Sequence, residues 1–167
     1  ERYHWAGWRL ALVARRVDMI ESWVMAVGIS AGSYEIYSAD VAQPDSVIAA
    51  CHACLERQGL PDVVVANAGI SVGVDTAQRG DLDVMAQTFA TNNLGMAATF
   101  HPFIDAMVRR GGGRLVGIGS VAGIRGLPGH GAYCASKAAV ISYCESLRGE
   151  LRGTGVQVVT ICPGYVD

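Results

Sequence analysis

The sequence has no apolar stretch approaching the roughly 20 residues that a bilayer span needs, and residues 1–4 lack the layout of a secretory signal. It also has no block of like charge, since 13 basic and 15 acidic residues give a net charge of -2. Such a chain lacks the clustered basic residues that bind a nucleic-acid backbone or an anionic membrane. We therefore expect a cytoplasmic protein with no nucleic-acid and no membrane partner, acting on a small molecule.

The cysteines do not fit a disulfide framework, because an odd count of five occurs in a chain large enough to bury a core. Cys51 and Cys54, on either side of His52, have half the spacing of a zinc site, but no second pair accompanies them. Both cysteines recur at helical spacing with neighbouring apolar residues. We expect them to be buried in a reduced protein that holds no metal.

Charged residues are also few, at 17% of the 167 residues, whereas hydrophobic residues make up 51%. No linker, repeat or low-complexity stretch interrupts the chain. The composition predicts a single compact domain, residues 1–167, with an apolar core.

Apolar runs of strand length alternate with amphipathic helical stretches along the chain. The expected strands are residues 9–13, 34–38, 62–66, 114–119 and 156–161, and the expected helices are residues 17–25, 44–58, 81–110 and 132–152, with a kink at Pro102. Apolar runs such as the three valines at 63–65 are typical of parallel strands covered by helices. The pattern predicts an α/β fold with a doubly wound parallel sheet.

This fold class normally opens with a strand and a turn, and the sequence has neither at its start. The chain begins in an expected helix, residues 1–6, with no glycine-rich turn before it, and it stops directly after a strand-end loop. A doubly wound sheet without its first strand lacks a central member. We therefore expect the sequence to be the interior of a longer domain.

Tyr133 and Lys137 are the first candidates for catalysis. They are four residues apart in an expected helix, so both side chains project from the same face. An ammonium at that spacing stabilises a phenolate and so favours acid–base work by the tyrosine. Because Lys137 is the only lysine in the sequence, its position beside Tyr133 favours a functional role over a solvated surface pair.

Two further polar residues lie where chemistry is expected. Ser120 follows the strand at 114–119, where its hydroxyl could hold a carbonyl oxygen beside Tyr133, although a serine there could equally form only a turn. Asn92 and Gly95 are both poor helix formers within the long expected helix. They predict either a local distortion of this helix that serves the function, or a second helix that packs closely against it at Gly95.

These residues together resemble the short-chain dehydrogenase/reductase family over residues 9–167. The motifs, in family order, are Asn67-Ala68-Gly69, Asn92, Ser120, Tyr133 with Lys137, and Pro163-Gly164. The resemblance implies a Rossmann-like three-layer fold, a nicotinamide cofactor and an oxidoreductase activity. It implies that Tyr133 is the general acid/base, that Lys137 supports it and binds the nicotinamide ribose, that Ser120 orients the substrate oxygen, and that Asn92 holds a water.

The family's glycine-rich pyrophosphate turn is absent and would lie before residue 1, which leaves a truncated or non-catalytic NADP(H)-binding relative as the alternative. The choice of cofactor depends on the end of the strand at 9–13. An NAD-preferring chain has an acidic residue there, whereas this chain has Ala14, Arg15 and Arg16, with no carboxylate nearby to repel a phosphate. Two guanidinium groups favour the 2′-phosphate of NADP over NAD.

By the same resemblance, Asp40 and Val41 contact the adenine, Asn67, Ala68 and Gly69 line its other side, and Pro163, Gly164 and Val166 meet the nicotinamide amide. The loop at 121–131 is apolar apart from Arg125 and His130, which indicates an uncharged or modestly polar carbonyl or alcohol as the substrate. Family members commonly pair through the two long helices, so we expect a homodimer or homotetramer.

Overall fold

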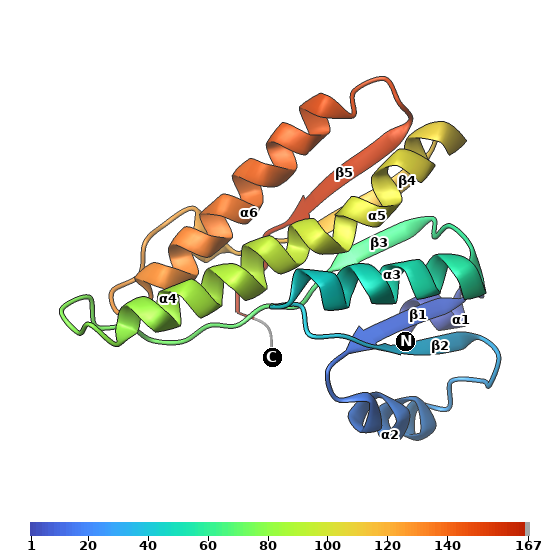
Figure 1. The fold of residues 1–167 in the computed structure, drawn as a ribbon, viewed down its shortest axis with the longest axis horizontal. Coiled ribbons are helices and arrows are strands. Elements are labelled where there is room, and N and C mark those ends of the chain that lie inside the picture. The colour runs from blue at the N-terminus through green and yellow to red at the C-terminus, as the bar shows by residue number, and fades with distance from the viewer. Residues whose placement is uncertain (166–167) are drawn as a thin grey trace.

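The computed structural model describes residues 1–165 and consists of parallel strands alternating with helices (Figure 1). The strands are β1 (Leu10–Ala14), β2 (Tyr34–Ser38), β3 (Val63–Ala66), β4 (Gly113–Ile118) and β5 (Val156–Ile161). The helices are α1 (Arg2–Trp5), α2 (Val17–Val27), α3 (Pro44–Gln58), α4 (Asp81–Phe89), α5 (Gly95–Arg110) and α6 (Gly131–Glu150), with a π-helix η1 (Ala90–Leu94) and a 3-10 turn η2 (Val121–Gly123). Each expected strand is confirmed to within one residue at either end.

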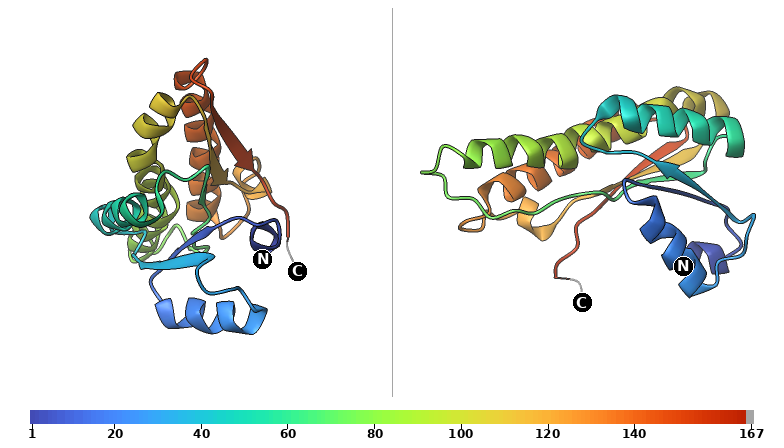
Figure 2. Two further views of the ribbon diagram at one scale, coloured as in Figure 1. Left: turned by 90° about the vertical axis from the view of Figure 1, so that its right-hand side faces the viewer. Right: turned by 60° about the horizontal axis from the view of Figure 1, so that its bottom comes forward.

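The elements form layers around the strands. Helices α3, α5 and α6 lie on one side of the strands, and α2 lies on the opposite side of β1 and β2 (Figure 2). Every strand pair is parallel, with Leu10 opposite Tyr34 in the first sheet and Val63 opposite Arg114 in the second. The expected α/β architecture of a doubly wound type is confirmed.

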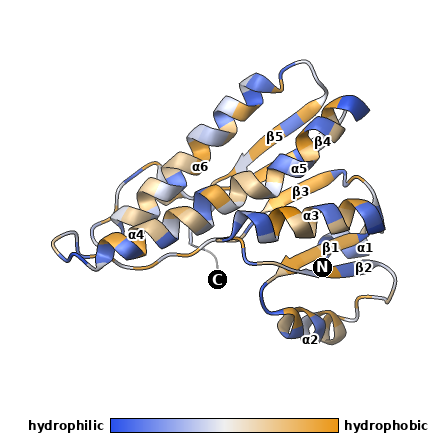
Figure 3. Cartoon of the chain, in the orientation of Figure 1, coloured by the Kyte–Doolittle hydropathy of each residue, from blue (hydrophilic) through white to orange (hydrophobic). Residues whose placement is uncertain are grey.

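The core lies between the strands and the α3, α5 and α6 layer. Phe100 and Met107 of α5 and Leu115 of β4 are fully buried there. Hydrophobic residues run along almost the whole of β1 and β3 (Figure 3), as parallel strands require. Cys51 and Cys54 are buried in the same core, as expected from their spacing. Between residues 1 and 165, no helix is both long and apolar enough to cross a membrane.

The strands form two sheets, β1-β2 and β3-β4-β5, rather than one. Within the described residues, β1 and β3 each pair with a strand on one edge only. A groove of about 390 Å³ separates the two unpaired edges, lined by Ala11 and Val13 of β1 and by Val63 and Val65 of β3. In the described residues, the facing edges of β1 and β3 are therefore open to this groove.

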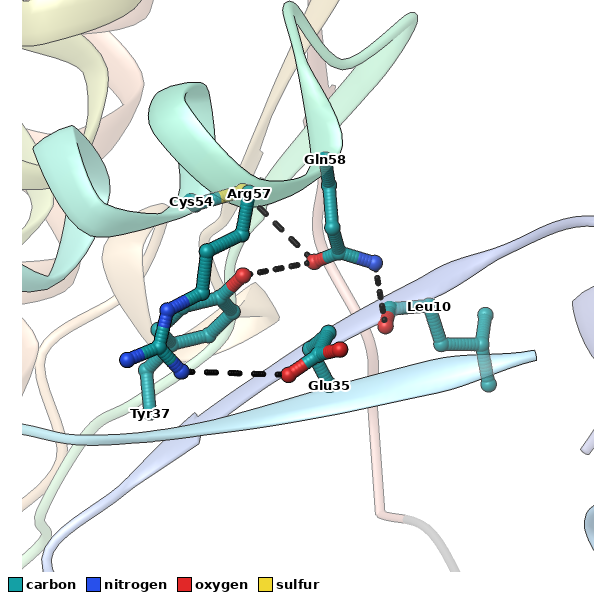
Figure 4. Close-up of polar contacts among 6 residues, drawn as sticks. All are labelled: Leu10, Glu35, Tyr37, Cys54, Arg57 and Gln58. Atoms are coloured by element: carbon teal, nitrogen blue, oxygen red, sulfur yellow. Dashed lines mark hydrogen bonds and ion pairs between the residues drawn. The ribbon is translucent and has the colours of Figure 1, made fainter. Parts of the chain in front are cut away.

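A polar cluster at the C-terminal end of α3 holds this helix against the first sheet (Figure 4). Gln58 accepts a 3.0 Å hydrogen bond from the Tyr37 hydroxyl and donates one of 3.1 Å to the Leu10 carbonyl. Arg57 lies 3.9 Å from a Glu35 carboxylate oxygen and over the Tyr37 ring. The side chain of Gln58 therefore bridges both strands of the sheet.

The long helix is interrupted at η1, and α5 continues as a helix through Pro102, so that a kink at Pro102 stays a prediction. The expected distortion around Asn92 and Gly95 is confirmed. Glycine is needed at 95 because a Cβ there would collide with the carbonyl oxygen of Val41, in the loop after β2. The close approach expected at Gly95 thus involves a loop instead of a second helix.

We predict that Gly95→Ala destabilises the fold, whereas Gly149→Ala, inside α6, stabilises it. A Cβ at 149 meets no atom within 4 Å, so alanine there gains about 0.5–1 kcal/mol of helix propensity. At 95 the Val41 backbone must move, and a cost of about 1–3 kcal/mol is expected. Urea denaturation of the two variants measures both effects. Equal shifts of the same sign would contradict the steric argument.

Candidate functional site

The structure brings Tyr133 and Lys137 together near the start of α6. Tyr133 is half-buried, and Lys137 is 5% exposed. Lys137 Nζ lies 5.8 Å from the centroid of the Tyr133 ring and donates a 2.7 Å hydrogen bond to the Ile118 carbonyl at the end of β4. The ammonium is therefore fixed between α6 and the strand end.

Burial lowers the pKa of the Lys137 ammonium below its ordinary value of 10.5, and the neighbouring Cys162 thiol partly offsets this effect. The charged form is less favoured in the folded protein than in the unfolded chain. Lys137 therefore reduces stability at neutral pH, and this cost diminishes as pH rises from the lowered pKa towards 10.5. Such a cost is typical of a residue retained for its chemistry.

Ser120 lies where β4 ends, at the N-terminus of η2. It is 8% exposed, and its Oγ accepts a 3.1 Å hydrogen bond from the Ala122 amide. Ser120 and Tyr133 line the same cavity of about 460 Å³. The serine is thus both a turn residue and a lining residue of a cavity large enough for a small organic molecule.

Asn92 lies in η1 and is 2% exposed. Its Oδ1 accepts a 2.8 Å hydrogen bond from the Ile70 amide, and its Nδ2 donates to the Ile70 carbonyl at 3.0 Å. Nδ2 also donates to Ser136 Oγ at 2.8 Å. The side chain of Asn92 therefore joins the loop after β3 to α6.

Ser136 is a member of this site that the sequence motifs did not single out. It is completely buried, and its Oγ donates a 2.8 Å hydrogen bond to the Tyr133 carbonyl. The Asn93 amide in turn donates to the Ser136 carbonyl at 2.8 Å. The sequence did offer a signal for Ser136, because it is a polar residue directly beside Lys137 on the face of α6 that is buried.

We predict that Ser136→Ala lowers the free energy of unfolding by about 1–3 kcal/mol, because it leaves the Asn92 amide without its partner in α6. Ser146→Ala is the matched control. Ser146 is an exposed residue of α6 whose Oγ contacts only Glu150. Its loss should change stability by less than about 0.5 kcal/mol in urea denaturation. Equal effects of the two substitutions would contradict a joining role for Ser136.

A second cavity, of about 660 Å³, collects most of the residues expected to contact a cofactor. Its lining comes from the ends of three strands and includes Ala14, Arg15, Arg16, Asp40, Val41, Ala68 and Gly69. Met19 and Trp23 of α2 also line it, which the sequence did not predict. These residues lie together because the carboxyl ends of parallel strands meet at one edge of a sheet.

The expectation that no carboxylate lies near the two arginines is wrong. Asp40, at the end of β2, lies 3.8 Å from the Arg15 guanidinium, since β1 and β2 are neighbours and end side by side. Arg16 forms no ion pair within the described residues. The two arginines therefore differ, with Arg15 partly neutralised and Arg16 available to an anion.

The remaining expected contacts lie on two other loops. Asn67 lines the groove between the sheets, and Gly69 follows closely, where a Cβ would come within 3.2 Å of Asn92 Oδ1 and 3.4 Å of Lys137 Nζ. The Pro163 carbonyl accepts a hydrogen bond from the Val121 amide, and Gly164 lines the cavity of Ser120 and Tyr133. Val166 lies outside the described residues.

Comparison with known proteins gives a match to the short chain dehydrogenase model over residues 1–167. The chain belongs to the short-chain dehydrogenase family. It is 39% identical over 163 residues to an uncharacterized oxidoreductase of Myxococcus xanthus, a match that covers 96% of this chain and 63% of that protein. The short-chain dehydrogenase/reductase resemblance of the sequence motifs is thereby confirmed.

Solved structures of short-chain dehydrogenases share the fold. The closed form of a serine dehydrogenase complexed with NADP+ has a TM-score of 0.87 and 27% identity, and the match covers 99% of this chain and 66% of that chain. A short chain dehydrogenase/reductase from Burkholderia phymatum, in complex with NAD, has a TM-score of 0.84 and 28% identity, with coverage of 95% and 57%. Neighbours of this chain thus bind either nicotinamide dinucleotide.

Proposed function

We propose that the protein is an NADP(H)-dependent oxidoreductase that interconverts a carbonyl compound and its alcohol. The observation that carries this proposal is the shared cavity of Ser120 and Tyr133, with the buried ammonium of Lys137 beside the tyrosine ring. The three side chains supply a proton donor, a hydroxyl that can hold the substrate oxygen, and a fixed positive charge. Family membership supports the reaction class.

In the reductive direction the Tyr133 hydroxyl donates a proton to the substrate oxygen, and in the oxidative direction it accepts one. Ser120, which lines the same cavity as the tyrosine, orients that oxygen through its Oγ. Lys137 supports the charge that develops on the tyrosine oxygen. The nicotinamide, when bound, supplies or accepts the hydride.

The residues of the second cavity fit a dinucleotide that carries a 2′-phosphate. Arg16 provides an unpaired cation, the side chains of Val41 and Ala68 provide apolar walls for a flat base, and Gly69 leaves space beside Lys137 and Asn92. A cation with a planar guanidinium matches a phosphate better than a ribose hydroxyl. These features support NADP(H) over NAD(H).

We predict that Arg16→Gln raises the Kd for NADPH by about tenfold to a hundredfold and leaves the Kd for NADH unchanged, because one charge-assisted contact to the phosphate is lost. Arg109→Gln is the matched control, since Arg109 is an exposed residue at the far end of α5. Nucleotide fluorescence titration gives the six dissociation constants, for the unmodified protein and both variants with each nucleotide. Tighter binding of NADH than NADPH by the unmodified protein would contradict the proposed cofactor.

The reaction class is tested with a panel of small aldehydes and ketones, each with NADPH and with NADH. Consumption of the reduced nucleotide that depends on the carbonyl compound is the expected result. Binding of NADPH without turnover of any compound would contradict the proposal and favour a non-catalytic nucleotide-binding protein.

A further inference from the structure

We propose that the substrate of this site is an oxo acid or hydroxy acid whose carboxylate is held by Arg125, in place of the uncharged compound expected from the apolar loop at 121–131. The inference rests on the proposed function and names its substrate class. Arg125 and His130 line the same cavity of about 460 Å³ as Ser120 and Tyr133. Both come from the loop between η2 and α6.

The charge on the described lining of this cavity is of one sign, positive. None of its described lining residues is acidic, and the sequence has no acidic residue between Asp105 and Glu145. Lys137 adds a buried positive charge 5.8 Å from the centroid of the Tyr133 ring. A cleft with charges of one sign and low-dielectric walls concentrates ligands of the opposite charge.

Arg125 is also free to bind. Within residues 1–165 it forms none of the ion pairs that occupy Arg15, Arg57, Arg79 and Arg110. An unpaired guanidinium presents donors in a fork that matches the two oxygens of a carboxylate. The His130 ring lies on the same loop and can donate an additional hydrogen bond.

The rest of the lining limits the size and character of the substrate. Val121, Ala122 and Leu127 add an apolar part to the lining of this cavity. A lining with two hydroxyl groups, an apolar part and a guanidinium fits a short aliphatic chain with a carbonyl at one end and a carboxylate at the other. Reduction converts the C=O to CH–OH with a hydride from the nicotinamide and a proton from Tyr133, and the carboxylate is unchanged.

The test compares acids with their neutral esters in the full-length protein. Levulinate and succinic semialdehyde are assayed against their methyl esters with NADPH, for the unmodified protein and for Arg125→Gln, Arg125→Lys and Arg109→Gln. We expect kcat/KM for the better acid to exceed that of its ester by about tenfold or more in the unmodified protein and in Arg109→Gln. Arg125→Gln should reduce this ratio to about one through KM, with turnover of the ester retained, and Arg125→Lys should keep part of it.

Binding without turnover provides an independent result. Saturation-transfer NMR of levulinate in the absence of nucleotide should show contact with the unmodified protein and at least a tenfold weaker affinity in Arg125→Gln. Ester turnover that equals acid turnover in every variant would overturn the inference and leave the proposed function intact. A lack of turnover with every carbonyl compound would contradict the proposed function, and levulinate binding that ignores Arg125→Gln would then overturn the inference as well.

Discussion

Replacement of Tyr133 by phenylalanine should lower kcat for carbonyl reduction by about a hundredfold to ten-thousandfold, the range of a lost general acid. Phenylalanine fills the same space in α6 and keeps its ring beside Lys137, but it has no proton to donate. The Kd for NADPH and the free energy of unfolding should stay close to those of the unmodified protein. Steady-state kinetics with a reducible aldehyde measures the effect.

Tyr143→Phe is the matched control, because Tyr143 lies on the same helix and is 38% exposed. Its kcat should change by less than about twofold. If Tyr133→Phe retained carbonyl reduction while its fold and NADPH affinity were intact, the proton donor would have to be a different group.

Replacement of Lys137 by methionine should have the second largest effect, a fall in kcat/KM of about a hundredfold or more. Methionine has a similar length and suits a buried position, but it removes both the ammonium beside Tyr133 and the hydrogen bond to the Ile118 carbonyl. Lys137→Arg keeps the charge and should lose less. Equal losses in the two variants would show that the shape of the side chain matters more than its charge.

The same substitution has a pH-dependent effect on stability. Because burial lowers the pKa of Lys137, the unfolded chain binds more protons than the folded protein between the lowered pKa and 10.5. The unmodified protein should therefore gain stability relative to Lys137→Met as pH rises through this window. Urea denaturation of both proteins over this pH range measures the difference, and a constant difference would contradict the effect of burial on Lys137.

Much of the fold could be predicted because the spacing of hydrophobic residues and the length of apolar runs are local properties of the sequence. The three valines of β3 and the alternation of strands with helices were sufficient to predict the parallel α/β architecture. The poor helix formers Asn92 and Gly95 were sufficient to predict the interruption of the long helix at η1. The identity of the close neighbour of Gly95 could not be predicted, because Val41 lies in a loop far away in the sequence.

The residues of the candidate site could likewise be predicted only in part. Tyr133, Lys137 and Ser120 could be placed together because a helical turn and a strand end fix their directions. The ion pair of Arg15 with Asp40 could not be anticipated, since the two residues belong to different strands whose pairing brings them side by side. Ser136 was missed because its role depends on a partner in η1, far away in the sequence.

Hydride transfer from the nicotinamide to the substrate can be followed with a deuterium label. The protein is given NADPH deuterated at the transferable position of the nicotinamide and a small aldehyde, and the alcohol product is examined by mass spectrometry and NMR. We expect one deuterium on the carbinol carbon of the product from the unmodified protein, and almost no product formed in the same time by Tyr133→Phe. Alcohol formed without deuterium at that carbon, or no alcohol from a folded protein that binds NADPH, would contradict the proposed function.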